Sequence, residues 1–182
     1  MKKMRILIIA SSPRKNGNSD KMAKSFADGA MSVGHEVTTV FIRDMHINGC
    51  IGCEYCYAHE GICAQQDDMQ AIYSILEHTD IVVFATPIYY QAFPAQLKAV
   101  IDRLYVTENR KFPVRGSVLL ATYATPGAEM AKLTIEYYHT LVNYHEWEDV
   151  GVLAKDGLDE KDDIQSDTLS KAYGMGMNIE GV

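Results

Sequence analysis

The chain has 182 residues and a formal net charge of −7, from 17 basic and 24 acidic side chains. A hydrophobic share of 47% beside 23% charged residues is typical of a globular protein and not of a disordered or fibrous one. The length predicts one domain over residues 1–182. The acidic balance argues against nucleic acid or an anionic membrane as the main partner, because both bind basic surfaces. Small molecules and other proteins remain.

No segment of the sequence is predicted to cross a membrane or to direct secretion. No apolar run approaches the roughly 18 residues that a bilayer requires. The apolar run within residues 4–10 is too short for a signal peptide, and Arg14 and Lys15 follow it closely. All four cysteines lie between Cys50 and Cys63, whereas a secreted disulfide framework would spread them more widely. We therefore expect a cytoplasmic protein with metal or redox chemistry at its cysteines.

Strand-like and helix-like segments alternate along the chain. The short apolar runs typical of buried strands are Met4–Ala10, His35–Ile42, Asp80–Ala85, Gly116–Thr122 and Glu148–Ala154. Helical periodicity is found over residues 22–33, 67–76, 94–104, 128–144 and 167–177. This alternation predicts an α/β fold with three layers, in which a five-stranded parallel sheet is covered by helices on both faces.

Three further features of the sequence concern two of the predicted helices and the connection before the last one. Asp67 and Asp68 are predicted to lie in the first turn of the second helix, where acidic groups favour the helix dipole. Gly174 and Gly176 interrupt the last helix, and glycine destabilises a helix interior. The charged stretch 155–167 is interpreted as a solvated connection.

The loop after the first predicted strand is a candidate phosphate site, because ligands of open parallel sheets bind outside the carboxyl ends of the strands. Its sequence, SSPRKNGNS, offers hydroxyls, amides, two cations and the N–H groups of the following helix. It matches neither the dinucleotide motif GxGxxG nor the triphosphate motif GxxxxGK[ST]. A strand-to-helix loop without a ligand can have the same composition. The candidate ligands are Ser11, Ser12, Arg14, Asn16, Asn18 and Ser19.

Two further loops are predicted at the same edge of the sheet. The loop after the third strand is rich in aromatic residues, and its candidate ligands are Thr86, Pro87, Ile88 and Tyr89. The loop after the fourth strand contains a glycine that would let backbone amides approach a ligand closely, and its candidates are Thr122, Tyr123, Thr125 and Gly127. Together the three loops predict a phosphate cradle with two walls for a flat aromatic group.

The succession of SSPRKNGNS, TPIYY followed by LKAVIDR, and ATYATPG resembles the flavodoxin-like fold in its NADPH-dependent FMN reductase branch, which includes the iron–sulfur flavoproteins. The resemblance extends from Met4 to about Met177. It implies a strand order of 2-1-3-4-5, one FMN per subunit and a homodimer or homotetramer. It also implies that Ser12, Arg14, Asn18 and Ser19 hold the phosphate, that Thr86, Pro87, Ile88 and Tyr89 hold the ring, and that Thr122, Tyr123 and Gly127 contact its other side.

The function that this resemblance implies is that of an NAD(P)H-dependent flavin oxidoreductase. Such an enzyme passes hydride from the nicotinamide co-substrate to FMN and on to a small acceptor such as a quinone or a flavin. The flavin would carry the electron chemistry, so no side chain is nominated as catalytic. The alternatives are an electron carrier that serves a ferredoxin-like partner and a flavin-free module that binds a metal or a nucleotide.

The cysteines form the pattern Cys50-x2-Cys53-x2-Cys56-x6-Cys63, between the second strand and its following helix. Four thiolates at such spacing can hold a [4Fe–4S] cluster, and the run resembles the compact motif of the iron–sulfur flavoproteins. Free or redox-active thiols, as in FMN-only reductases, are an alternative. Zinc is a third interpretation, although zinc sites more often use two well-separated pairs of ligands. We expect this loop on the same side of the sheet as the FMN.

Overall fold

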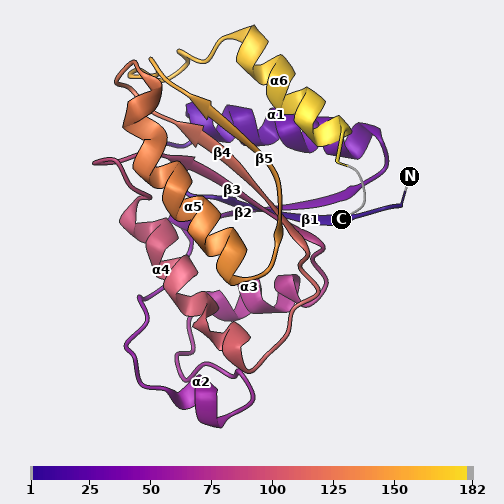
Figure 1. The fold of residues 1–182 in the computed structure, drawn as a ribbon, viewed down its shortest axis with the longest axis vertical. Coiled ribbons are helices and arrows are strands. Elements are labelled where there is room, and N and C mark those ends of the chain that lie inside the picture. The colour runs from indigo at the N-terminus through magenta and orange to yellow at the C-terminus, as the bar shows by residue number, and fades with distance from the viewer. Residues whose placement is uncertain (1, 180–182) are drawn as a thin grey trace.

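The computed structural model describes residues 2–179, so residues 1 and 180–182 of the predicted domain lie outside the described part. Its centre is a five-stranded parallel sheet in the order β2-β1-β3-β4-β5 (Figure 1). This arrangement confirms the predicted fold class and strand order. The strands are β1 (Arg5–Ala10), β2 (Glu36–Phe41), β3 (Ile81–Pro87), β4 (Gly116–Thr122) and β5 (Glu148–Lys155).

Helices cover both faces of the sheet (Figure 1). One face carries α1 (Asn18–Ser32) and α6 (Ser166–Met177), and the other carries α3 (Met69–Leu76), α4 (Ala95–Arg103) and α5 (Lys132–Tyr144). Side chains of a strand alternate between the two cores: Leu7 and Ile9 pack toward α3 and α4, whereas Ile6 and Ile8 pack toward α1 and α6. Within residues 2–179, no helix has the length and apolar character needed to span a bilayer.

The two helices on the first face approach each other at glycines. A Cβ atom on Gly29 of α1 would lie 2.1 Å from the carbonyl oxygen of Tyr173, and one on Gly176 of α6 would lie 2.1 Å from that of Phe26. Gly176 therefore serves the packing of α6 on α1, whereas a Cβ atom on Gly174 would meet no other atom within 4 Å. The last predicted helix is confirmed, and one of its two glycines has a structural reason.

Three helix boundaries differ from the prediction, and the first is that α1 begins at Asn18, before the predicted range 22–33. The second predicted helix begins at Met69, and Asp67 lies just before it, where its carboxylate accepts the N–H of Met69 at 3.2 Å and forms a buried ion pair with Arg103. The helix predicted over residues 128–144 is divided into a 3₁₀ turn at Ala128–Ala131 and α5. Further short elements are α2 (Tyr55–Ala58) and the 3₁₀ turns Ile42–Asp44 and Leu104–Glu108.

The connection from β5 to α6 is exposed at most of its charged residues, as its charge predicted, but it is also anchored in the core. Leu158 and Ile164 are buried in the core beneath α1 and α6. The segment runs along the carboxyl edge of the sheet before α6 begins (Figure 1). We call residues 156–164 the strap. These two apolar anchors within an acidic segment help to hold the strap against the protein.

Candidate functional site

A cleft of about 170 Å³ lies at the carboxyl edge of the sheet, where the loops after β1, β3 and β4 meet. The predicted ligands that line it are Ser12, Arg14, Asn18, Ser19, Pro87, Ile88, Tyr89, Thr122 and Tyr123. The remaining lining comes from Gly17, Ala124 and the strap residues Leu158, Asp159 and Lys161. The fold therefore brings the three predicted loops together and adds a fourth segment that the sequence did not indicate.

The N-terminus of α1 faces this cleft without a side-chain cap. Gly17 is its N-cap residue, and among the described residues no side-chain hydrogen bond caps this helix start. The preceding loop is folded on itself: the N–H of Arg14 donates to Ser12 Oγ at 3.2 Å, and the N–H of Gly17 donates to the carbonyl of Arg14 at 3.2 Å. An uncapped helix start combines unpartnered N–H groups with a partial positive charge. This donor set fits a phosphate monoester.

Five of the predicted ligands do not line the cleft, namely Ser11, Asn16, Thr86, Thr125 and Gly127. The buried hydroxyl of Ser11 donates to Thr86 Oγ1 at 2.8 Å, which joins the ends of β1 and β3. Gly127 adopts a φ of +116°, and its N–H donates to the Asp156 carboxylate at 3.0 Å. Thr125 is exposed on the loop after β4. Ser11, Thr86 and Gly127 therefore stabilise the loops that form the cleft.

The buried guanidinium of Arg43 fastens the loop after β1 to α1. Arg43, in the 3₁₀ turn after β2, donates from Nη1 to the Asp20 carboxylate at 3.0 Å and to the carbonyl of Ser12 at 3.1 Å. Asp20 also accepts the N–H of Asn16 at 2.8 Å, where the backbone has a φ of +56°. The side chains of Arg43 and Asp20 are only 11% and 7% exposed. The sequence could not have predicted this pair, because no local pattern indicates that Arg43 lies beside Ser12.

The strap is fastened to the same loop by side chains that had been predicted to hold phosphate. Arg14 Nη1 donates to the carbonyl of Asp159 at 2.8 Å. Asn18 Nδ2 donates to the carbonyl of Glu160 at 2.8 Å, and Asn18 Oδ1 accepts the N–H of Ile164 at 3.2 Å. Both polar ends of the Asn18 side chain thus contact the strap, which leaves the second Nδ2–H and the backbone N–H of Asn18 as donors for a ligand.

The two walls of the cleft are joined to each other and to α1. The N–H of Ile88 donates to the carbonyl of Thr122 at 2.8 Å, and the hydroxyls of Ser19 and Thr122 are hydrogen-bonded at 2.7 Å. Burial raises the pKa of Tyr123, and the carboxylates of Asp156 and Glu129 raise it further. The Tyr123 phenol is therefore protonated at neutral pH.

The cysteine loop lies away from this cleft, so its expected position on the same side as the cofactor is wrong. The loop leaves the sheet after β2 but continues along α4 to its far end (Figure 1). There Asn109 Nδ2 donates to the carbonyl of Tyr57 at 3.0 Å. Gly61, with a φ of +76°, packs against Arg110, where a Cβ atom would lie 2.3 Å from that side chain.

The four thiols have different surroundings. Cys50 and Cys53 are exposed, and Cys56 and Cys63 are half-buried. Burial raises the pKa of the Cys56 thiol, and the nearby Cys63 and Cys50 raise it further. Cys53 lines a separate surface hollow with Ile51 and Tyr55. The donor set matches the four thiolates of a cluster, but within residues 2–179 no three acidic, His or Cys side chains converge as a metal site.

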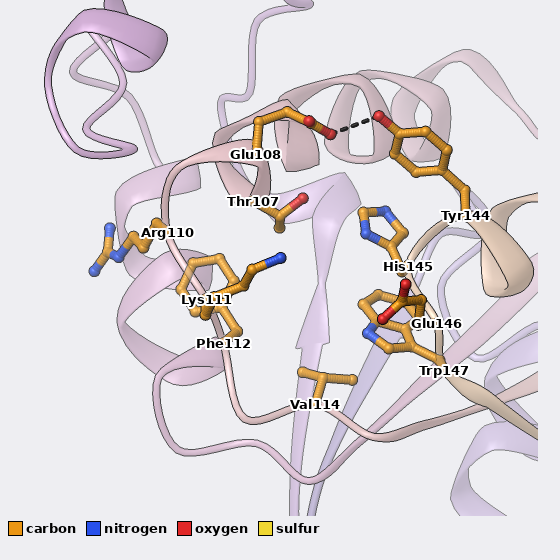
Figure 2. A pocket seen from close by; sticks show the side chains of 10 residues that line it. All are labelled: Thr107, Glu108, Arg110, Lys111, Phe112, Val114, Tyr144, His145, Glu146 and Trp147. Carbon is orange, nitrogen blue, oxygen red and sulfur yellow. Dashed lines mark hydrogen bonds between the residues drawn. The ribbon is translucent and has the colours of Figure 1, made fainter.

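A larger cavity, of about 340 Å³, lies at the opposite edge of the sheet (Figure 2). It lies between the segment before β4 and the segment before β5. The Tyr144 hydroxyl donates to Glu108 at 2.5 Å, and the His145 and Trp147 rings are stacked with centroids 4.5 Å apart. Burial lowers the pKa of His145. Because open parallel sheets bind ligands at their carboxyl ends, we place the candidate site in the smaller cleft.

The comparisons with known proteins agree on a family and a fold. A family model described as NADPH-dependent FMN reductase matches residues 4–151. An iron–sulfur flavoprotein from Archaeoglobus fulgidus is 41% identical over 101 residues, or 56% of this chain and 46% of that protein. Another iron–sulfur flavoprotein, from Methanosarcina thermophila, is 34% identical over 115 residues, which are 63% of this chain and 60% of that protein. The matched segments thus span about half the length of these curated relatives.

A solved structure has the same fold over almost the entire length of both chains. It is an NAD(P)H:quinone oxidoreductase from Methanothermobacter marburgensis, with a TM-score of 0.80 and 17% identity. The alignment covers 98% of this chain and 97% of that one. At this level of identity the likeness establishes the flavodoxin-like architecture.

Proposed function

The chain belongs to the NADPH-dependent FMN reductase family, and from this premise we propose that it is an NAD(P)H-dependent flavin oxidoreductase with FMN in the cleft at the carboxyl edge of the sheet. FMN bound there would supply the redox chemistry that links a reduced nicotinamide to a small acceptor such as a quinone or a flavin. The observation that carries the proposal is the uncapped N-terminus of α1, which faces a cleft lined by the loops of two further strands.

The loop after β1 would bind the phosphate of FMN. Ser12 and Ser19 offer hydroxyls, and the first turn of α1 offers N–H groups. A guanidinium carries five N–H donors, so Arg14 can contact the phosphate while its Nη1 donates to the strap. Asn18 would contribute its backbone N–H. The phosphate would thus be held mainly by oriented donors at a positive helix end.

The other two loops would orient the flavin ring. Pro87, Ile88 and Tyr89 form one wall of the cleft, and Thr122 and Tyr123 form the other. Apolar and aromatic walls exclude water and favour a planar ligand. No acid or base is required from these side chains for hydride transfer between two cofactors, so we assign the chain a binding and orienting role.

A second candidate function is an iron–sulfur flavoprotein that passes electrons to a ferredoxin-like protein. It is supported by four cysteines on one loop and by the two curated relatives, both iron–sulfur flavoproteins. Cys50, Cys53, Cys56 and Cys63 would supply the four thiolates of a [4Fe–4S] cluster. Free thiols or zinc at the same residues would support the first function alone.

One preparation tests both functions. The protein is purified without oxygen, its absorption spectrum is recorded, and its iron and zinc are measured. Flavin bands with steady-state oxidation of NADH or NADPH by a quinone would support the oxidoreductase. About four irons per chain, with strong coupling to ferredoxin and no nicotinamide activity, would support the electron carrier. Protein that neither carries nor takes up FMN would refute both.

The phosphate assignment is tested with Arg14→Ala. Removing a charged hydrogen bond worth roughly 1.5–3 kcal/mol should weaken FMN binding much more than riboflavin binding, because riboflavin lacks the phosphate. An equal loss for both ligands would show that Arg14 does not bind the phosphate.

The assembly and domain organisation are also proposals. We propose one domain over the whole chain and a homodimer or homotetramer, on the strength of the family resemblance. Light scattering after size-exclusion chromatography measures the assembly, and limited proteolysis tests whether the chain behaves as one unit.

A further inference from the structure

The strap is held in place across the carboxyl edge of the sheet. Arg14 and Asn18 donate to two of its carbonyls, both at 2.8 Å. On its other side, the N–H groups of Gly157 and Leu158 donate to carbonyls of the loop after β4, at 3.1 and 3.0 Å. The apolar anchors Leu158 and Ile164 are each 7% exposed. The strap therefore joins the loop after β1 to the loop after β4, the two loops between which a phosphate-bearing ligand would enter.

One strap cation is left facing the cleft. Lys161 lines it together with Ser12 and Arg14. The next residue, Asp162, forms its ion pair with Lys21 of α1, whereas Lys161 attracts Asp162 more weakly and without an ion-pair contact. Among residues 2–179, no carboxylate is in ion-pair contact with Lys161. The charge of this ammonium is thus available to a ligand beside the uncapped start of α1.

Asp159 lines the cleft close to Lys161 in the chain but carries the opposite charge. Its carbonyl accepts the hydrogen bond from Arg14, whereas its carboxylate would repel a bound phosphate. Substitutions at these two residues should therefore change the affinity for an anion in opposite directions. If the strap had only a structural role, both substitutions would weaken the binding of the anion.

We propose that the strap completes the phosphate site of the cleft and that Lys161 binds the 5′-phosphate of FMN. This inference rests on the proposed function and extends it, because it adds a binding residue from outside the loop after β1. Lys161 supplies a mobile point charge, while the first turn of α1 supplies oriented N–H donors.

The test compares two ligands that differ only in the phosphate. FMN and riboflavin are titrated into the flavin-free full-length chain, and binding is followed by flavin fluorescence. Lys161→Gln should weaken FMN about tenfold and leave riboflavin unchanged, as expected for the loss of a charged contact to the phosphate. Asp159→Asn should tighten FMN only. Added KCl should weaken FMN binding less in Lys161→Gln than in the unaltered chain, because one screened charge has been removed.

Lys171→Gln is the matched control, since Lys171 is an exposed lysine of α6 whose ion-pair partner is Asp167. It should change neither affinity. If Lys161→Gln weakened the binding of FMN and riboflavin equally, or weakened neither, the assignment of Lys161 to the phosphate would be wrong. FMN binding by the unaltered chain would still support the proposed function in that case. An unaltered chain that bound neither flavin would overturn the proposed function and this inference with it.

Discussion

Arg103 and Asp67 form a two-pronged ion pair in which the side chains are only 1% and 4% exposed. Nη1 lies 2.8 Å from Oδ2, and Nη2 lies 3.1 Å from Oδ1. Arg103 also donates to the carbonyl of Asn48 at 3.0 Å, and Asp67 accepts the N–H of Asn48 at 2.9 Å. Because Asn48 and Asp67 flank the cysteine segment, the ion pair closes the base of this loop and fastens it to the end of α4.

Replacing Arg103 should therefore destabilise the protein strongly. Arg103→Met leaves the Asp67 carboxylate buried without its cation, which should cost about 3–5 kcal/mol in the free energy of unfolding measured with urea. Lys98→Met removes only the exposed pair with Asp102 and should cost about 0.3–0.5 kcal/mol. Combining Arg103→Met with Asp67→Leu should restore much of the loss. Similar stabilities for Arg103→Met and Lys98→Met would contradict this account.

The same ion pair predicts a loss of stability in acid. Burial raises the pKa of Asp67, but Arg103 and two backbone N–H groups outweigh this effect and hold the pKa below its usual 3.8. The contribution of the pair is thus present above the unfolded-state pKa of about 4 and is lost as the pH falls through the folded-state pKa. Urea unfolding from pH 6 to pH 3 should show a smaller acid-dependent decrease for Asp67→Asn than for the unaltered chain, and identical decreases would refute the assignment.

Alanine substitutions at the two glycines of α6 should change the stability of the protein in opposite directions. Gly176→Ala places a Cβ atom 2.1 Å from the carbonyl oxygen of Phe26, so α6 must move away from α1. We expect a loss of roughly 1–3 kcal/mol, as for other overpacked contacts. Gly174→Ala meets no atom within 4 Å and should stabilise the helix by about 0.5–1 kcal/mol. Thermal unfolding of the two variants measures both effects, and destabilisation by Gly174→Ala would contradict the prediction.

Arg43 should act as a positioning residue for the phosphate. Arg43→Met removes the donor to the Ser12 carbonyl and leaves Asp20 buried without its cation, so the loop after β1 should lose its shape. We expect FMN affinity to fall by about tenfold or more, with a smaller fall for riboflavin. Arg5→Met is the control, because Arg5 pairs with Asp80 at the opposite edge of the sheet. The idea fails if calorimetry finds the same FMN affinity in Arg43→Met and Arg5→Met.

Metal content should distinguish the roles of residues on the cysteine loop. If these thiols bind a cluster, Cys63→Ser should lose iron when purified without oxygen, while retaining FMN, because the loop lies away from the cleft. His59→Ala removes a ring that is stacked on Tyr55, with centroids 3.7 Å apart, and hydrogen-bonded to the Tyr55 carbonyl at 2.8 Å, but no thiol, and should retain iron. Equal iron in the two variants, or zinc in place of iron, would exclude a cluster held by Cys63.

Much of the fold could be predicted from the sequence because its signals are local. The strand Ile81–Pro87 is fully buried, and a strand covered on both faces must be apolar along its length. The meeting of the loops after β1, β3 and β4 was equally predictable, since the carboxyl ends of parallel strands share one edge. Loop order alone thus assigns Ser12, Arg14 and Tyr123 to one site, and all three line the cleft.

The sequence by itself therefore determined the fold class and the edge at which a ligand would bind, because apolar periodicity and loop composition are properties of neighbouring residues. Only the tertiary structure decided which charges meet. Arg43 contacts Ser12 across 31 positions, and Arg14 contacts Asp159 across 145. The positions of the strap and of the cysteine loop could not be predicted for the same reason: a charged or glycine-rich segment can lie against many surfaces, and its final position is set by a few anchors, such as Leu158 or the Asp67–Arg103 pair, whose partners lie far away in the chain.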